Sequence, residues 1–266
     1  MDYIESIILG VVQGLTEFLP ISSSGHLEIF KVVFNSDYST KESLLFTIVL
    51  HFATALSTMV FFRKEISLIF EGLFNSKDKS SKEFSISILI SMIPATLIGF
   101  FFEDTINSFF DGNLIFVGIM LYITAILLYL SDVITSKRNS VNYKNSFIIG
   151  LAQAIAIMPG ISRSGATIAT AVVLGIEREK AARFSFLMVV PLIFGSMLKS
   201  IIDNGGLKFE NFDLITISLG FISAFITGLL ACKWMIALVK KSKLYYFSIY
   251  CLLVGSIIIF YTINGI

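Results

Sequence analysis

Charge is scarce in this sequence. Only 15% of its 266 residues are charged, and 20 basic against 19 acidic residues leave a net charge of +1. The basic residues are spread through loops, which excludes the basic patch of a nucleic-acid-binding protein. Hydrophobic residues make up 55% of the chain and the mean hydropathy is +0.85, whereas soluble domains hold about 45–50% apolar residues. We therefore expect a multi-pass membrane protein whose partner is the bilayer.

Cysteine and histidine are also rare. The two cysteines, Cys232 and Cys251, both lie in or beside apolar stretches, so no disulfide framework is indicated. The N-terminus, MDYIESIILG, has acidic residues and no positive region, and we expect no cleavable signal peptide there. His26 closes a polar stretch, EFLPISSSGH. His51 lies in an apolar segment, where we expect it to serve packing, with lining of the cavity as the alternative.

Apolar segments set the predicted fold. Pieces of 10–14 apolar residues are too short to cross a bilayer, which takes about 20 residues, and they are re-entrant candidates. The short pieces form two pairs, joined by the turns PISSSG and PGISRSG. We predict an all-α integral membrane protein, a single membrane domain over 1–266, with six transmembrane helices and two re-entrant helix pairs. The spans are roughly 43–62, 84–102, 112–131, 184–202, 212–232 and 244–263, and the short pieces are about 3–19, 25–34, 146–158 and 165–176.

The chain repeats itself after a shift of 140 positions. Gly10 to Gln13 then falls on Gly150 to Gln153, and Ile21 to Gly25 falls on Ile161 to Gly165. Each repeat, about 1–135 and 141–266, holds one re-entrant pair and three spans. Because three is odd, the repeats must have inverted topology, and we expect the two turns to meet near the midplane.

The loops predict an orientation. Basic residues gather in cytoplasmic loops of membrane proteins, and the loops at 63–83, 132–145, 177–183 and 233–243 share one side in this topology. Both termini are therefore predicted outside. These loops carry fifteen of the 20 basic residues: Arg63, Lys64, Lys77, Lys79, Lys82, Lys137, Arg138, Lys144, Arg178, Lys180, Arg183, Lys233, Lys240, Lys241 and Lys243. The other side carries Lys31, Lys41, Lys199 and Lys208.

The two turns differ in the polar groups that they carry. Glu17 falls on Ile157, and Ser23 falls on Arg163. A charge inside a membrane is costly and marks function, and arginine binds phosphate oxygens bidentately. Serines and glycines before a helix offer hydroxyls and amides to an anion. We expect a phosphate group to be bound by Arg163 together with Ser22, Ser24, Gly25, Ser162, Ser164, Gly165, Thr167 and Gln153.

The first turn also suggests reaction chemistry. Glu17 and Gln13, one helical turn apart, are candidates to hold a divalent cation against phosphate oxygens. His26 is a candidate nucleophile or general acid–base. Ser23 is the alternative nucleophile, with His26 as its base. The residues alone leave these two roles open.

The motifs QGLTEFLPISSSGH and PGISRSGAT closely resemble the two signatures of the bacterial undecaprenyl-diphosphate phosphatase family, also known as bacitracin-resistance protein. The resemblance covers essentially the whole chain. It implies an enzyme of the bacterial plasma membrane that hydrolyses the lipid diphosphate to the monophosphate and inorganic phosphate. Hydrolysis recycles the lipid carrier for cell-wall synthesis and confers bacitracin resistance.

The resemblance also implies a cofactor and residue roles. The implied cofactor is a divalent cation, Mg²⁺ or Ca²⁺, and the active site is expected to open to the outer face. The implied roles fall on Gln13, Glu17, Ser23, His26 and Arg163. The first position of the acidic motif is Gln13 rather than glutamate, which leaves one fewer carboxylate for a metal.

Two alternatives accompany this reading. Inverted repeats are common in transporters, so a polyprenyl-phosphate flippase that uses the same site is the alternative function. Gly220, Ala224 and Gly228 recur at four-residue spacing on one helical face. This face is expected to pack another helix, either within the protomer or in a homodimer.

Overall fold

The computed structural model describes residues 2–34, 40–74, 79–109, 113–134, 139–203, 213–241 and 244–264. These residues form helices and one isolated β-bridge, and no named strand is found among them. Lys77, Lys137, Arg138, Lys208 and Lys243, which entered the orientation prediction, lie outside the described residues, as does the side chain of Lys41. The predicted all-α class is confirmed.

Six long helices match the six predicted apolar segments. Five of them are long and apolar enough to cross a membrane. The remaining one, Thr40–Phe61, passes the same test only together with the helix that follows it, as a bent pair. The predicted multi-pass membrane class is therefore confirmed at five to six candidate spans. The long helices are α3 (Thr40–Phe61), α5 (Lys79–Phe101), α7 (Leu114–Val133), α10 (Arg178–Asp203), α11 (Leu214–Lys240) and α12 (Leu244–Asn264).

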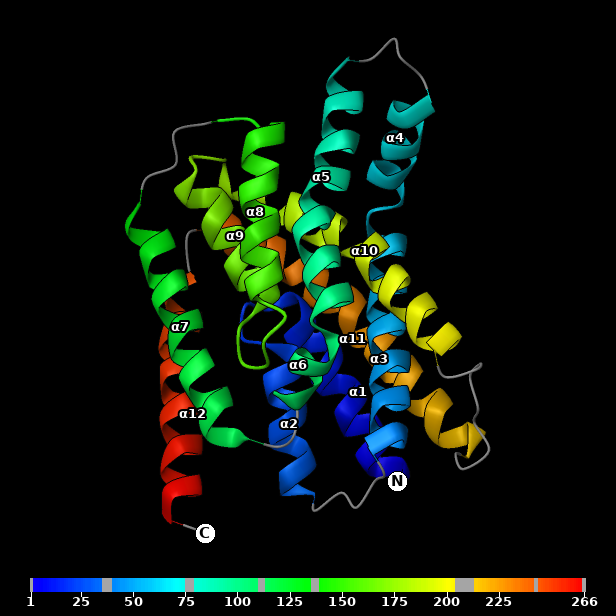
Figure 1. Ribbon diagram of the computed structural model, residues 1–266, viewed down its shortest axis with the longest axis vertical. Helices are drawn as coiled ribbons and strands as arrows, with labels where there is room; N and C mark the ends of the chain where they lie inside the picture. The colour runs from blue at the N-terminus through cyan, green and yellow to red at the C-terminus, as the bar shows by residue number, and fades with distance from the viewer. Residues whose placement is uncertain are drawn as a thin grey trace.

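Four shorter helices match the predicted short pieces. They are α1 (Tyr3–Phe18), α2 (Ser23–Val33), α8 (Tyr143–Ile155) and α9 (Arg163–Val173). In Figure 1 the pairs α1–α2 and α8–α9 reach in from opposite ends of the molecule, and their turns lie in its middle. Both second helices begin in the same way. Ser22 Oγ accepts from Gly25 N at 3.2 Å, and Ser162 Oγ accepts from Gly165 N at 3.0 Å, so a serine caps each helix.

Parts of the predicted loops are helical. The segment after α3 forms α4 (Arg63–Phe74), which bends away from α3 by 82°. Helix α10 already begins at Arg178, α11 continues to Lys240, and a short α6 (Glu103–Ser108) follows α5. Hydropathy detects only the apolar part of a helix. Lysine, arginine and glutamate favour the helical conformation almost as well as leucine, so the charged ends prolong these helices.

Close helix contacts depend on small residues. An added Cβ at Gly10 in α1 would lie 2.5 Å from the Gly220 carbonyl of α11, and one at Gly150 in α8 would lie 2.4 Å from the Ser91 carbonyl of α5. Gly220, Ala224 and Gly228 are all buried within the chain, where α11 packs on α1 and α3. Their small-residue face therefore packs inside the protomer.

The two turns touch each other directly. Gly160 N donates to Ser22 Oγ at 3.2 Å, and Ser164 Oγ donates to the Leu19 carbonyl at 3.3 Å. Thr124 Oγ1 of α7 donates to the Gly160 carbonyl at 3.0 Å. Gly160 has φ of +96°, and a Cβ there would lie 2.5 Å from the Val117 carbonyl. Only glycine fits this position, which joins both turns to α7.

Replacing Gly160 tests this junction. Gly160→Ala forces a left-handed conformation, which costs about 1–2 kcal/mol, and adds a backbone clash. We expect a clearly lowered thermal midpoint in detergent. Gly99→Ala is the matched control, because nothing lies within 4 Å of a Cβ at Gly99 in helix α5, and alanine there is expected to stabilise by about 0.5–1 kcal/mol. Equal effects of the two substitutions would contradict the junction.

Candidate functional site

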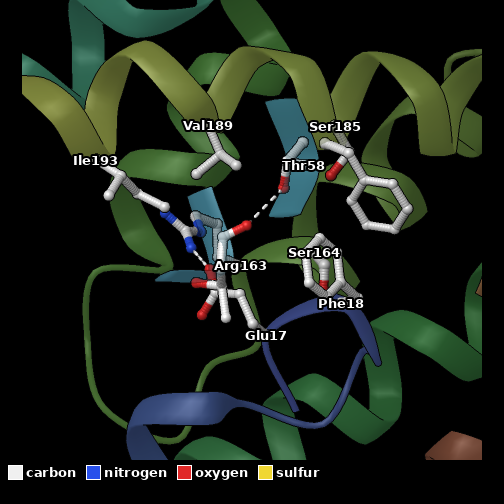
Figure 2. A pocket seen from close by; sticks show the side chains of 10 residues that line it. Glu17, Phe18, Thr58, Arg163, Ser164, Ser185, Val189 and Ile193 are labelled. Carbon is white, nitrogen blue, oxygen red and sulfur yellow. Dashed lines mark hydrogen bonds and ion pairs between the residues drawn. The ribbon is translucent and has the colours of Figure 1, made fainter. Parts of the chain in front are cut away.

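The carboxylate of Glu17, at the end of α1, is the centre of the site. Its Oε1 forms an ion pair with the guanidinium of Arg163, the first residue of α9. Its Oε2 accepts from Ser23 Oγ at 2.8 Å and from Gln13 Nε2 at 3.0 Å. Figure 2 shows Glu17 and Arg163 facing each other across the meeting point of the turns. The structure thus brings together four residues that the sequence placed in two separate motifs.

A small pocket opens beside this ion pair. Thr54 and Thr58 of α3, Ser164 of α9 and Ser185 of α10 supply its hydroxyl groups. Its apolar wall is made by Phe18, Phe186, Val189 and Ile193 (Figure 2). The Glu17 side chain is 5% exposed, whereas that of Arg163 is 23% exposed. The guanidinium is therefore the charged group of the pair that a ligand in the pocket can reach.

Several predicted phosphate-binding hydroxyls are engaged in the junction itself. Ser22 is buried, and it is the only non-glycine residue with positive φ, +71°, in the described part of the chain. Its Oγ accepts from Gly25 N and Gly160 N. Such a backbone conformation persists only where the surroundings impose it. Ser22 therefore holds the two turns in place.

Hydroxyls of the second turn also hold the junction, except for one that faces the pocket. Ser162 caps α9, and Thr167 Oγ1 lies 2.6 Å from Ser185 Oγ and donates to the Arg163 carbonyl at 2.8 Å. Ser164 lines the pocket. Ser24 Oγ, on the first turn, lies 3.4 Å from Ser22 Oγ. Among the predicted hydroxyls, Ser164 is thus the one that both belongs to a turn and faces the pocket.

His26 is fixed by two partners. Its Nδ1 lies 2.8 Å from the Ser22 carbonyl, and a carbonyl only accepts, so Nδ1 carries the hydrogen. Its Nε2 lies 2.8 Å from the Tyr250 hydroxyl of α12, and the two rings are stacked with centroids 5.7 Å apart. Within the described part of the chain no hydrogen bond joins His26 to Ser23, whose hydroxyl donates to Glu17 instead. The arrangement therefore supplies Glu17, and not His26, as the base next to Ser23.

His51 is a site residue for which the sequence favoured packing over the alternative of lining the cavity. The structure places its Nε2 3.7 Å from Glu17 Oε2, although we expected the residue to serve packing. Its Nδ1 lies 2.9 Å from the Thr47 carbonyl of its own helix, α3. A single histidine in an apolar segment carries no signal of this placement. Only the folding of α3 against α1 brings the two side chains together.

Gln13 and Gln153, which the 140-residue shift aligns, carry buried amide atoms that lack hydrogen-bond partners among the described residues. Gln13 Oε1 is buried with no hydrogen-bond partner among the described residues, and the same holds for both amide atoms of Gln153. A buried acceptor without a partner is rare and calls for an explanation. Gln13 Oε1 and the Glu17 carboxylate are oxygen donors of the kind that Mg²⁺ and Ca²⁺ prefer. No group of three His, Cys, Asp or Glu side chains suited to a metal occurs among the described residues, so a cation here would also need phosphate oxygens.

Comparison with known proteins assigns the chain to a family. The family model described as Bacitracin resistance protein BacA matches residues 6–257, which include both turns. The chain belongs to this family. The membership that the motifs predicted is therefore confirmed.

Relatives in the BacA family match the chain over nearly its whole length. A protein of Christiangramia forsetii is 56% identical over 255 residues, which are 96% of each chain. One of Parabacteroides distasonis is 48% identical over 97% of this chain and 98% of its own. One of Methanococcus vannielii is 42% identical over 97% of this chain and 99% of its own. All three are named undecaprenyl-diphosphatase.

The ion pair between Glu17 and Arg163 is expected to stabilise the folded protein. Arg163→Met leaves the buried Glu17 carboxylate without its cationic partner, which costs about 3–5 kcal/mol for a buried pair. The double variant Glu17→Gln with Arg163→Met removes both charges, and we expect it to unfold at a higher temperature than Arg163→Met alone. Thermal unfolding of both variants in detergent measures this difference. A double variant no more stable than the single one would show that the two charges are not coupled.

Proposed function

We propose that this BacA-family protein is an undecaprenyl-diphosphatase, which hydrolyses undecaprenyl or a related polyprenyl diphosphate to the monophosphate and inorganic phosphate. This activity recycles the lipid carrier for cell-wall synthesis and confers bacitracin resistance. The observation that carries the proposal is the ion pair of Glu17 with Arg163 beside the Ser23 hydroxyl, at a pocket inside a membrane protein. The names of the relatives support it.

Arg163 is the proposed phosphate-binding group. A guanidinium has five N–H donors, and the pair with Glu17 leaves several of them for phosphate oxygens. The pocket beside Arg163 is small and open on one side. We propose that only the phosphate end of the substrate reaches Arg163, while the polyprenyl tail stays in contact with apolar helix surface or lipid.

Ser23 is the proposed nucleophile, with Glu17 as its base. Ser23 Oγ attacks the terminal phosphorus while its proton passes to Glu17 Oε2, to which it already donates at 2.8 Å. The bond from phosphorus to the bridging oxygen breaks, and the lipid monophosphate leaves. Water then hydrolyses the phosphoserine. His26, held by Ser22 and Tyr250, keeps the turn that carries Ser23 in position.

Glu17 and Gln13 are the proposed holders of a divalent cation, Mg²⁺ or Ca²⁺. The free acceptor Gln13 Oε1 supports this assignment. When bound, such a cation would neutralise charge on the phosphate oxygens. The Glu17 carboxylate and the Gln13 amide would hold it on the side of Glu17 where Ser23 lies.

The predicted topology is part of the proposal. Six spans and two re-entrant pairs, in inverted repeats of about 1–135 and 141–266, place both termini outside and the site open to the outer face. The two termini lie at the same end of Figure 1. Ion pairs also join segments that this topology puts in the cytoplasm: Arg178 with Asp132, and Glu179 with both Arg183 and Lys240. Neither the pocket nor the comparisons favour the flippase alternative.

Phosphate release tests the proposed activity. Purified protein given a polyprenyl diphosphate is expected to release phosphate, and excess EDTA is expected to stop the release. Ser23→Ala and Glu17→Gln should lower kcat by at least about 10²-fold, because they remove the nucleophile and its base. Val60→Ala, on the exposed side of α3, is the control that should keep wild-type activity. Absence of release from folded wild-type protein would overturn the proposal.

Cysteine labelling tests the proposed orientation. In a variant without Cys232 and Cys251, which are both buried, Ser140→Cys and Asn264→Cys introduce single exposed thiols. A membrane-impermeant maleimide applied to intact cells should label Asn264→Cys, because the C-terminus is outside. Ser140→Cys should react only after the membrane is opened. The reverse labelling pattern would show that the chain has the opposite orientation in the membrane.

A further inference from the structure

Next to Glu17, His51 offers an acceptor to which no described residue donates. Because Nδ1 donates to the Thr47 carbonyl, Nε2 of the neutral ring has a lone pair and no hydrogen. It lies 3.7 Å from Glu17 Oε2, which is also an acceptor, so the two atoms do not bond to each other. No donor to Nε2 is found among the described residues. The side chain is 25% exposed, so the protein does not cover it completely.

Every other basic group next to Glu17 is already engaged. Glu17 Oε2 accepts from both Ser23 and Gln13, and Oε1 pairs with Arg163. His26 uses both ring nitrogens for Ser22 and Tyr250. Among the described residues, the Nε2 atom of His51 is therefore the basic acceptor that remains for a molecule entering next to Glu17, since the free Gln13 Oε1 is an amide oxygen and not a base.

The proposed reaction needs such a second acceptor. In the first step Glu17 takes the proton of Ser23. When the phosphoserine is hydrolysed, the bond from phosphorus to Ser23 Oγ breaks, and Glu17 returns that proton to Oγ. The attacking water must lose a proton in the same step, while Glu17 is still protonated. One carboxylate cannot serve both transfers at once.

We propose that His51 is a catalytic residue of this second step, an inference that rests on the proposed function. Its Nε2 accepts a hydrogen bond from the attacking water and orients the water oxygen toward phosphorus. The bond from water oxygen to phosphorus forms, the bond to Ser23 Oγ breaks, and the water proton passes to Nε2. Inorganic phosphate leaves, and the imidazolium returns its proton to solvent.

Rapid-mixing kinetics of His51→Ala tests this role. The first step does not use His51, so we expect one lipid monophosphate per enzyme in a fast initial burst at the wild-type rate. Subsequent release of inorganic phosphate should fall about 10²–10⁴-fold, the usual contribution of a general base, and phosphoserine should accumulate at Ser23. Imidazole added to His51→Ala should restore part of the slow phase. Val60→Ala, on the same helix, should behave as wild type.

Three outcomes would overturn the role of His51. Unchanged steady-state turnover of His51→Ala would show that the residue is dispensable. Loss of the burst itself, as expected for Ser23→Ala, would place His51 in the first step. A raised Mg²⁺ requirement with full activity at saturation would make it a cation ligand. All three require active wild-type protein, so they are distinct from a failure of the proposed function, in which the wild type releases no phosphate.

Discussion

The buried ion pair between Glu17 and Arg163 is the interaction on which the rest of the site depends. Each charge sits on a different turn, and each would be costly to bury without the other. Their pairing therefore fixes the relative position of α1–α2 and α8–α9, whose turns meet in the middle of the molecule (Figure 1). It also orients the carboxylate, so that Oε2 faces Ser23. One electrostatic constraint thus joins the fold to the chemistry.

Under the 140-residue shift, several matching residues hold the backbone, whereas the residues that face Glu17 differ between the two segments. Positions that are alike in both repeats hold the backbone: Ser22 and Ser162 cap equivalent helices, and Gly10 and Gly150 admit a neighbouring helix. The unlike pair of Ser23 and Arg163 faces Glu17, which itself corresponds to an isoleucine. His26 is an exception, because it is unlike its counterpart yet structural, with Tyr250 as its support. Most of the proposed chemistry thus falls on positions where the two aligned segments differ, and Gln13, which matches Gln153, is the exception.

Hydropathy and motif spacing predicted the helices and the meeting of Glu17 with Arg163, because both follow from local sequence and from the 140-residue shift. They did not predict α4, since its charged residues look like a solvated loop although they favour helix. The partner of His26 lies 224 positions away in α12, and no local pattern reveals it. For His51 the sequence favoured packing over a place in the cavity for the same reason: an imidazole on an apolar helix shows its role only when its neighbours are known.

The electrostatics of the pair also explain why a cation belongs in the proposed mechanism. Glu17 and Arg163 together carry no net charge, and the nearby pair of Glu28 with Lys31 is neutral as well. An entering diphosphate adds negative charge next to the Glu17 carboxylate, where the repulsion is poorly screened because the group is buried. Arg163 then has to pair with the Glu17 carboxylate and with the diphosphate at the same time. A divalent ion beside Gln13 Oε1 would offset the added charge, and it would leave Arg163 free to hold the phosphoryl group that is transferred.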